Sequence, residues 1–425
     1  MLPSAPAGCR KTILCLTGAG TNPALLTPEI TTALLDWDLF AAPSTYRSGP
    51  TDLIRMNSSD TRPNFFPWLA GQTLDAFGPG DQANFEDLIH IAELMGSILP
   101  LPPDHATASF ARFYGAGLLL PSAAGHAISD KNLRFVAERA ATFVLRTVYD
   151  RTRIATTSDA RTLLERLVAS DFVLRHCSLN YDTLALPTSS HFWTGYPEGF
   201  GANTFSFAAS PPASEHLNIQ MHGSVNFAVG GSLTDACSIV RFDDPDDASK
   251  NWDISSSGHS AMDRHDSPRV PLIAGRRKAE KGLIEPFSSY LHYFRELAFA
   301  TPRWLVLGYG GGDYHINGIL QSAAEHWGSA LRIFVCNYLP LADVDDGTTA
   351  YTVANGYPAY HMLATRQAGI LTAFPTDVRE FHAKASPNPT LDRNATNKVT
   401  ERLSLTVDGA YAGHEGDIIG HLSSI

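Results

Sequence analysis

The sequence predicts an α/β fold, in which a parallel sheet is flanked by helices and carries a helical insertion. Short apolar runs recur along the chain and end in glycine or polar residues, as the buried strands of parallel sheets do. Between about residues 84 and 169 helical periodicity takes over, which indicates an inserted helical layer. Strand, glycine turn and helix follow one another near the N-terminus in the order that a Rossmann-like dinucleotide-binding unit requires.

The first strand and helix of this unit are expected before residue 40. Residues 11–17 form an apolar run that ends in Gly18, Ala19 and Gly20, which fits a buried strand entering a tight turn. Thr27 then has the form of a helix N-cap, with a proline and an acid in the first turn after it. A helix is therefore expected directly after the glycine turn.

The insertion carries three apolar stripes at helical spacing. Their members are Leu88, Ile89, Ala92 and Met95, then Leu133, Val136, Ala140 and Val144, and last Leu163, Leu164, Leu167 and Val168. Ser158 stands before the third stripe as its expected N-cap. Stripes of this kind form core far more often than cofactor sites, so we expect them to be buried.

Four more strands are expected, and each leads into residues that can bind a ligand. They span residues 172–179, 217–221, 304–307 and 331–335, with helices over 286–300 and about 315–327. The first strand meets Asn180 and Asp182, and the second meets His222. The third is followed by a glycine-rich turn that begins at Gly308, and the fourth ends near Asn337. Open α/β sheets bind ligands at the carboxyl ends of their strands, so these residues are the candidates for chemistry.

Composition limits the class of protein. A chain of 425 residues with 44% hydrophobic content can bury a large core, and its length suggests two to three domains. Apolar stretches near the N-terminus are too short to span a bilayer and lack the features of a secretory signal, so we expect a soluble, cytoplasmic protein. A formal net charge of −11 disfavours broad contact with phosphate backbones, and neither direct nucleic-acid binding nor membrane association is expected.

Cysteines and acidic residues give two further expectations. The five cysteines are scattered, so neither a disulfide framework nor a paired-cysteine zinc site is expected. Residues 228–270 are rich in glycine, serine and aspartate and are expected to form a long loop, as a lid or a partner contact. The acidic tract 243–247 within it fits a solvated loop, with cation binding as the alternative.

The two glycine turns are candidate nucleotide-binding loops. Gly18-Ala19-Gly20 can point backbone N–H groups at a pyrophosphate, and the cluster from Gly308 to Asp313 can cradle a phosphate or a ribose in the same way. Each has a structural alternative, the first as a plain turn and the second as a flexible hinge. A dehydrogenase fingerprint would place a third glycine where Pro23 stands, so the first turn is not diagnostic by itself.

Asn180, Asp182 and His222 are the candidate catalytic residues. Alternation along an extended chain places Asn180 and Asp182 on the same side, where they can grip one ligand. Each of the three also has an ordinary interpretation, because asparagine and aspartate form turns and an isolated histidine is more often part of a core or a surface. Their joint appearance, after separate strands, favours a shared site.

Together these motifs resemble those of the sirtuin superfamily, and specifically of the sirtuin-like NAD⁺ hydrolases of bacterial antiphage systems. Gly18-Ala19-Gly20-Thr21-Asn22 resembles the first phosphate-binding loop of that family. Asn180-Tyr181-Asp182 resembles its Asn-x-Asp motif, which holds the nicotinamide ribose and carboxamide. His222-Gly223-Ser224 resembles the His-Gly motif that carries the catalytic base.

Later motifs extend the resemblance over residues 11–340. Gly308-Tyr309, with Asp313 and Ile316-Asn317, is similar to the nucleotide-ribose loop of the bacterial branch, and Asn337 stands where the family contacts the adenosine side. Asn84-Phe85-Glu86-Asp87 is similar to a short segment of the same branch.

The resemblance implies an enzyme that cleaves NAD⁺ at the nicotinamide–ribose bond, giving ADP-ribose and nicotinamide, as an antiphage effector that depletes NAD⁺. His222 would be the base, Asn180 would hold the ribose hydroxyls or the attacking water, and Asp182 would hold the carboxamide. The nucleotide would be bound by Gly18, Ala19, Gly20, Thr21, Asn22, Gly308, Tyr309, Asp313 and Asn337. An NAD⁺-dependent protein deacylase and a non-catalytic sensor of NAD⁺ or ADP-ribose are the alternatives.

The chain departs from the deacylases of this family in two respects. It lacks their Gly-Ile-Pro-Asp-Phe-Arg segment and their four-cysteine zinc module, which favours water as the acceptor and predicts no structural zinc. The resemblance predicts a catalytic domain over 1–340, including the insertion at about 84–169, and leaves 341–425 as a C-terminal extension of unassigned structure. It also implies a homo-oligomer, or action beside a HerA-type ATPase or an Argonaute-like protein.

Overall fold

The structure is a computed structural model of the whole chain. It describes residues 11–22, 27–37, 66–67, 69–70, 84–98, 130–154, 158–170, 172–185, 192–196, 203–205, 215–230, 238–252, 271–274, 278, 282–309, 313–336, 397–398, 403–406 and 413–424. Asn337 and the glycines at 310–312, all expected near the site, lie outside these ranges.

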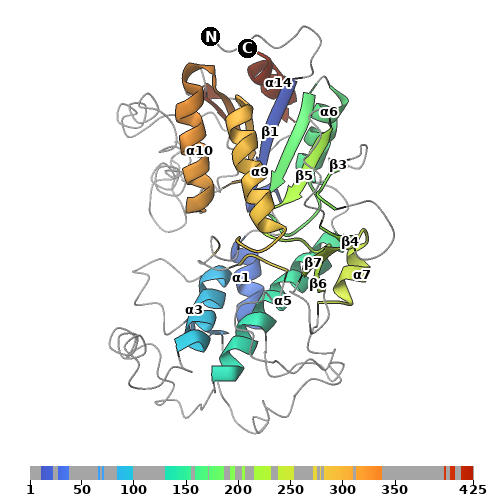
Figure 1. Cartoon of the computed structure of the whole chain (residues 1–425), viewed down its shortest axis with the longest axis vertical. Coiled ribbons are helices and arrows are strands. Elements are labelled where there is room, and N and C mark those ends of the chain that lie inside the picture. The colour runs from blue at the N-terminus through green and yellow to red at the C-terminus, as the bar shows by residue number, and fades with distance from the viewer. Residues whose placement is uncertain are drawn as a thin grey trace, which may run out of the picture.

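One large sheet organises the molecule (Figure 1). Its strands are β1 (Lys11–Thr17), β2 (Phe172–Ser178), β3 (Phe192–Trp193), β5 (His216–Gln220), β8 (Arg303–Leu307), β9 (Arg332–Cys336), β10 (Asn397–Lys398) and β11 (Leu403–Thr406). They lie in the order β10-β11-β9-β8-β1-β2-β5-β3, and every neighbouring pair is parallel except β10 with β11. The predicted α/β, Rossmann-like fold class is confirmed.

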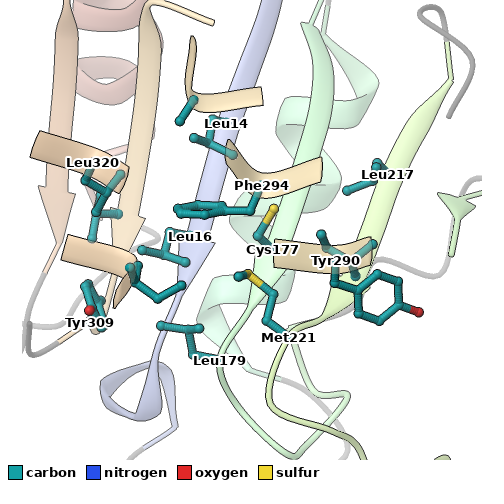
Figure 2. Packing of buried hydrophobic residues seen from close by; sticks show 14 of the residues in the cluster. Leu14, Leu16, Cys177, Leu179, Leu217, Met221, Tyr290, Phe294, Tyr309 and Leu320 are labelled. Atoms are coloured by element: carbon teal, nitrogen blue, oxygen red, sulfur yellow. The ribbon is translucent and has the colours of Figure 1, made fainter. Parts of the chain in front are cut away.

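Both faces of the sheet are covered, which is why its strands read as continuous apolar runs. Leu14 and Leu16 of β1 point into one core with helices α9 (Phe287–Ala300) and α10 (Tyr314–Trp327), and Ile13 and Cys15 point into the other with α6 (Asp159–Ala169) and α14 (Glu415–Ser423). In Figure 2, Phe294 of α9 lies against the sheet near Leu16. Successive side chains of a strand point to opposite faces, so this single strand contributes apolar residues to both cores.

Helices α1 (Thr27–Asp36), α3 (Phe85–Ile98) and α5 (Asp130–Ile154) form a separate layer below the sheet in Figure 1, on the side of the strands' carboxyl ends. Their stripes are core, as predicted: Leu88, Ile89, Ala92, Ala140 and Val144 are buried in one cluster. The side chains of Met95, Leu133 and Val136 are outside the described set. The third stripe differs from expectation, because α6 packs on β2 and so belongs to the sheet, not to the helical layer.

The segment expected as a long loop is partly ordered structure. A small antiparallel sheet consists of β4 (Asn203–Thr204), β6 (Phe227–Gly230) and β7 (Ser238–Arg241), and a helix, α7 (Pro245–Ser249), follows it. The expected solvated tract 243–247 starts this helix, because the Asp244 side chain accepts a 2.8 Å hydrogen bond from the Asp246 N–H. Elements this short carry too little apolar periodicity to stand out in the sequence. Residues 253–270 lie outside the described ranges.

Part of the extension 341–425 belongs to the main sheet. Strand β11 pairs with β9 in parallel, and α14 covers that edge with Ile418 and Leu422, both fully buried. The described part of the extension therefore completes the sheet. No helix in the described ranges combines the length and apolar content needed to cross a bilayer.

Candidate functional site

The predicted site residues gather at the carboxyl edge of the sheet, where the strand order reverses. From β1 the chain adds β2 and β5 on one side, and later β8 and β9 on the other, so the reversal lies between β1 and β8. Gly18 follows β1, Asn180 follows β2, His222 follows β5 and Gly308 follows β8. Open α/β sheets bind ligands at such a switch point. Asn337, just after β9, is outside the described residues.

The two glycine turns meet in direct backbone contact. The Gly18 N–H donates to the Leu307 carbonyl at 2.9 Å, and the Gly20 N–H donates to the Gly308 carbonyl at 2.9 Å. The Thr21 N–H donates to the Gly18 carbonyl at 3.0 Å. These three amides are therefore satisfied within the protein.

Close approach explains the glycines of both turns. Gly308 has a φ of +60°, and a Cβ on it would lie 2.3 Å from the Thr21 nitrogen. A Cβ on Gly18 would lie 2.8 Å from the Gly308 oxygen. Neither position has room for a side chain, so the plain-turn alternative accounts for these residues without a ligand. The contact still places Thr21 and Asn22 at the switch point.

Asn180 is tied to the first turn. Its side-chain N–H donates to Thr21 Oγ1 at 2.7 Å, and Thr21 Oγ1 donates to the Gly18 carbonyl at 2.9 Å. Asn180 and Thr21 are both buried, with 7% and 4% exposure. Two of the predicted blocks, 159 residues apart in the chain, thus share one hydrogen bond at the sheet edge.

The segments after β2 and β5 remain paired beyond the strands. The Met221 N–H donates to the Ser178 carbonyl and the Val225 N–H to the Tyr181 carbonyl, each at 2.8 Å. On its other side, the His222 carbonyl accepts from the Ile273 N–H at 2.8 Å. The His-Gly segment is therefore fixed against the Asn-Tyr-Asp segment, as a shared site requires.

His222 presents a buried, neutral imidazole. The ring is 3% exposed and hydrogen-bonds the backbone of Leu179, while Nε2 has no hydrogen-bond partner among the described residues. Asp313 Oδ1 lies 4.0 Å from Nε2. Burial, with the charges of Lys278 and His315, lowers the pKa of His222 to about 3, although Asp313 and Leu179 act in the opposite direction. The Nε2 lone pair is thus open to accept a proton.

Asp182 closes a turn. Its Oδ1 accepts from the Leu184 N–H at 2.8 Å, and the side chain is buried at 4% exposure. Burial raises the pKa of Asp182 to about 6, with the backbone N–H groups of Leu184 and Asp182 itself offsetting part of the rise. The turn-forming interpretation accounts for this contact, and Asn180 and Asp182 have different partners.

The block after β8 is held together by Tyr309. Its hydroxyl lies 2.9 Å from Asn317 Oδ1 and accepts from the Asp313 N–H at 3.2 Å. Tyr309 is 2% exposed, and burial raises its pKa, as does the nearby charge of Asp313. The predicted residues Gly308, Tyr309 and Asp313 therefore lie together at the site.

Two charged residues that the sequence did not assign to the site stand beside it. Lys278 Nζ lies 2.9 Å from Glu86 Oε1 and 2.8 Å from Asp313 Oδ1. Lys278 follows two arginines in the sequence, a run that is typical of a solvated surface, so nothing local indicated its burial. Glu86 lay in a segment noted only for its resemblance to the bacterial branch.

The site was also compared with known metal-binding arrangements and the chain with known proteins. Within the described ranges, no group of three or more His, Cys, Asp or Glu side chains is placed to hold a metal ion. No protein-family profile and no curated protein matches the chain.

Proposed function

We propose that the chain hydrolyses NAD⁺ at its nicotinamide–ribose bond, giving nicotinamide and ADP-ribose. The observation that carries the proposal is the open Nε2 of the buried His222, held against the Asn180 segment at the switch point of the sheet. A buried imidazole with one nitrogen fixed and the other unpartnered is suited to accept a proton from a ligand. The motif resemblance, from Gly18 to Asn317, indicates NAD⁺ as that ligand.

The reaction needs a base and correct orientation. Nicotinamide leaves with the electrons of the glycosidic bond and becomes neutral, so no acid is required. A water oxygen bonds to the ribose carbon, whose transition state has oxocarbenium character, and the released proton passes to His222 Nε2. The lowered pKa keeps His222 unprotonated before the reaction, and the carboxylate of Asp313 at 4.0 Å stabilises the imidazolium that forms.

The remaining site residues orient the substrate in this proposal. Asn180 would release Thr21 and hold the ribose hydroxyls or the water, and Asp182 would hold the nicotinamide carboxamide. Thr21 and Asn22 at the first turn, and Tyr309 at the second, would contact the nucleotide. The other residues assigned to nucleotide binding, Gly18, Ala19, Gly20, Gly308, Asp313 and Asn337, keep that assignment as a proposal.

The first prediction is that the purified protein releases nicotinamide from NAD⁺. Chromatography of nicotinamide, with and without an acyl-peptide, distinguishes the three candidate functions. Release without the peptide indicates hydrolysis, and release only with the peptide indicates deacylation. Binding of NAD⁺ without release of nicotinamide indicates a sensor. His222→Ala and Asn180→Ala should each reduce release by about 10² to 10⁴-fold, because both act on the ribose or the attacking water.

The matched control is His292→Ala, since His292 is an exposed histidine on α9 with 65% side-chain exposure. It should keep the wild-type rate. Circular dichroism of all three variants checks that the fold is intact. Near-wild-type turnover in His222→Ala would refute the assignment of the base.

The biological setting rests on the resemblance alone. It implies depletion of NAD⁺ in antiphage defence, by a homo-oligomer or beside a HerA-type ATPase or an Argonaute-like protein. The apolar stripes on α3 and α5 are buried against each other and against α1, so within the described residues they supply no separate argument for assembly.

A further inference from the structure

Glu86, Lys278 and Asp313 form a half-buried charged cluster between the helical layer and His222. Lys278 contacts Glu86 at 2.9 Å and Asp313 at 2.8 Å, and the side-chain exposures are 13% for Lys278, 26% for Glu86 and 11% for Asp313. Glu86 belongs to α3, and Asp313 precedes α10. The cluster therefore joins three segments that are distant in the sequence.

Asp313 has the sequence position of a helix cap but does not serve as one. It is the N-cap residue of α10, yet its side chain makes no capping hydrogen bond. The carboxylate lies instead 2.8 Å from Lys278 Nζ and 4.0 Å from His222 Nε2. The Asp313 N–H donates to the Tyr309 hydroxyl at 3.2 Å, which ties the residue to the end of β8.

The charges of the cluster are suited to a histidine that gains a proton. Two carboxylates against one ammonium leave one negative charge, which an imidazolium on His222 would balance. The groups facing His222 are Lys278, Asp313 and His315, and of these only the carboxylate favours the protonated ring. His222 and Lys278 hold the pKa of Asp313 below its usual value, against the effect of burial.

We propose that Lys278 is a positioning residue for the reaction: it keeps Asp313 ionised and in place beside His222, and its charge keeps the imidazole unprotonated until the reaction delivers a proton. The proposal rests on the function proposed above, in which His222 is the base. Lys278 acts through Asp313 and through its charge, without touching the substrate.

Histidine NMR tests the electrostatic part without any substrate. With ¹³C-labelled histidine and His222→Asn to assign the signal, we expect His222 in Lys278→Met to begin protonating at a pH about one to three units higher than in the wild type. Asp313→Asn should move the titration in the opposite direction. Lys278→Gln, which loses the charge but keeps a hydrogen-bond donor, replaces Lys278→Met if that variant does not fold.

Activity measurements test the positioning part. In Lys278→Met, kcat should fall at acidic pH and recover as the pH rises, whereas Lys278→Arg should retain the wild-type pH profile. Lys250→Met is the control, because Lys250 forms an ion pair with Asp247 but is 71% exposed and lies outside the cluster.

The outcomes separate this proposal from the proposed function. Superimposable His222 titrations in the wild type, Lys278→Met and Asp313→Asn would overturn the role of Lys278, whatever the activity. An equal loss of kcat at every pH would overturn it as well, because a merely structural residue behaves in that way. A wild type that releases no nicotinamide would refute the hydrolase, while the titration shifts would still report on the cluster.

Discussion

Gly308 decides whether the two loops of the site can meet. Its φ of +60° lies in the left-handed region, and its Cα faces the backbone of the first turn so closely that a Cβ would lie 2.3 Å from the Thr21 nitrogen. Residues other than glycine pay about 1 to 2 kcal/mol for this conformation even in open space. At Gly308 the overlap of a Cβ with the backbone of Thr21 would add to this cost.

The residue-scale prediction is that Gly308→Ala lowers the free energy of unfolding by about 1 to 3 kcal/mol or more, since backbone strain and overlap with Thr21 add. The measurement is urea denaturation followed by circular dichroism. Gly318→Ala is the matched control: Gly318 lies within α10, where a Cβ would meet nothing within 4 Å. That variant should gain about 0.5 to 1 kcal/mol, because alanine favours helix. Equal stability of the two variants would contradict the packing argument.

The helices and strands show where local patterns suffice. The run at 11–17 became β1 with the same bounds, and the expected helix over 286–300 became α9, Phe287–Ala300. Ser158 is the N-cap of α6, as predicted, and its hydroxyl oxygen accepts from the Arg161 N–H at 3.2 Å. The same hydroxyl donates to the Leu184 carbonyl at 3.2 Å, a contact that joins α6 to the turn after Asp182.

The element-scale prediction concerns this cap. Ser158→Ala should lower the free energy of unfolding by about 0.5 to 2 kcal/mol, because it removes the side-chain acceptor of the Arg161 N–H and the donor to the Leu184 carbonyl, leaving the Arg161 N–H only the Ser158 carbonyl at 3.0 Å. Ser322→Ala is the control, since Ser322 lies exposed within α10 and donates to the Gly318 carbonyl one turn earlier. Alanine should be neutral or slightly stabilising there. Matched urea curves for both variants decide the point, and an equal effect in the two would argue against the cap.

Acid stability belongs to the molecule as a whole, because it depends on buried histidines in separate segments, His176 within β2 and His222 after β5. Burial lowers the pKa of His176 to about 4 and that of His222 to about 3, so both rings are neutral in the folded state. The unfolded chain takes up these protons near pH 6.5. Stability is therefore unaffected above about pH 6.5 and falls as the pH drops from there towards about 4. Asp182 acts in the opposite sense, because its pKa of about 6 is raised and its protonation favours the fold.

The whole-molecule prediction follows from that balance. Each histidine should cost about 2 kcal/mol of stability at pH 5 relative to pH 7, and Asp182 should return about 1 kcal/mol. Urea midpoints measured across this pH range should therefore fall on acidification. In His176→Gln, which can still bond Thr17 as His176 does at 2.9 Å, the fall should be roughly a third as steep, because one of the two histidine contributions is gone while that of Asp182 remains. His292→Gln on the exposed side of α9 is the control, and curves for His176→Gln that run parallel to the wild type would contradict the assignment.

The sequence predicted that Asn180, His222 and Gly308 lie at one edge of the sheet, but it did not predict their contacts. Asn180, His222 and Gly308 were recognisable because each follows a strand, and carboxyl ends of parallel strands share one edge. The hydrogen bond from Asn180 to Thr21 joins residues 159 positions apart, and the glycine turns satisfy each other's backbone. No local pattern contains such pairings.

The sequence by itself determined five strands of the main sheet, the long helices, the Ser158 cap and the order of the polar residues at the sheet edge, because these follow from periodicity and backbone preference within a few residues. Only the tertiary structure decided that Lys278 joins Glu86 to Asp313, that Nε2 of His222 faces that carboxylate, and that residues after 397 complete the sheet. Long-range packing sets which charges lose their water and which partners replace it. The free energy of burying a charge depends on which groups surround it in space, and local sequence patterns do not specify those groups.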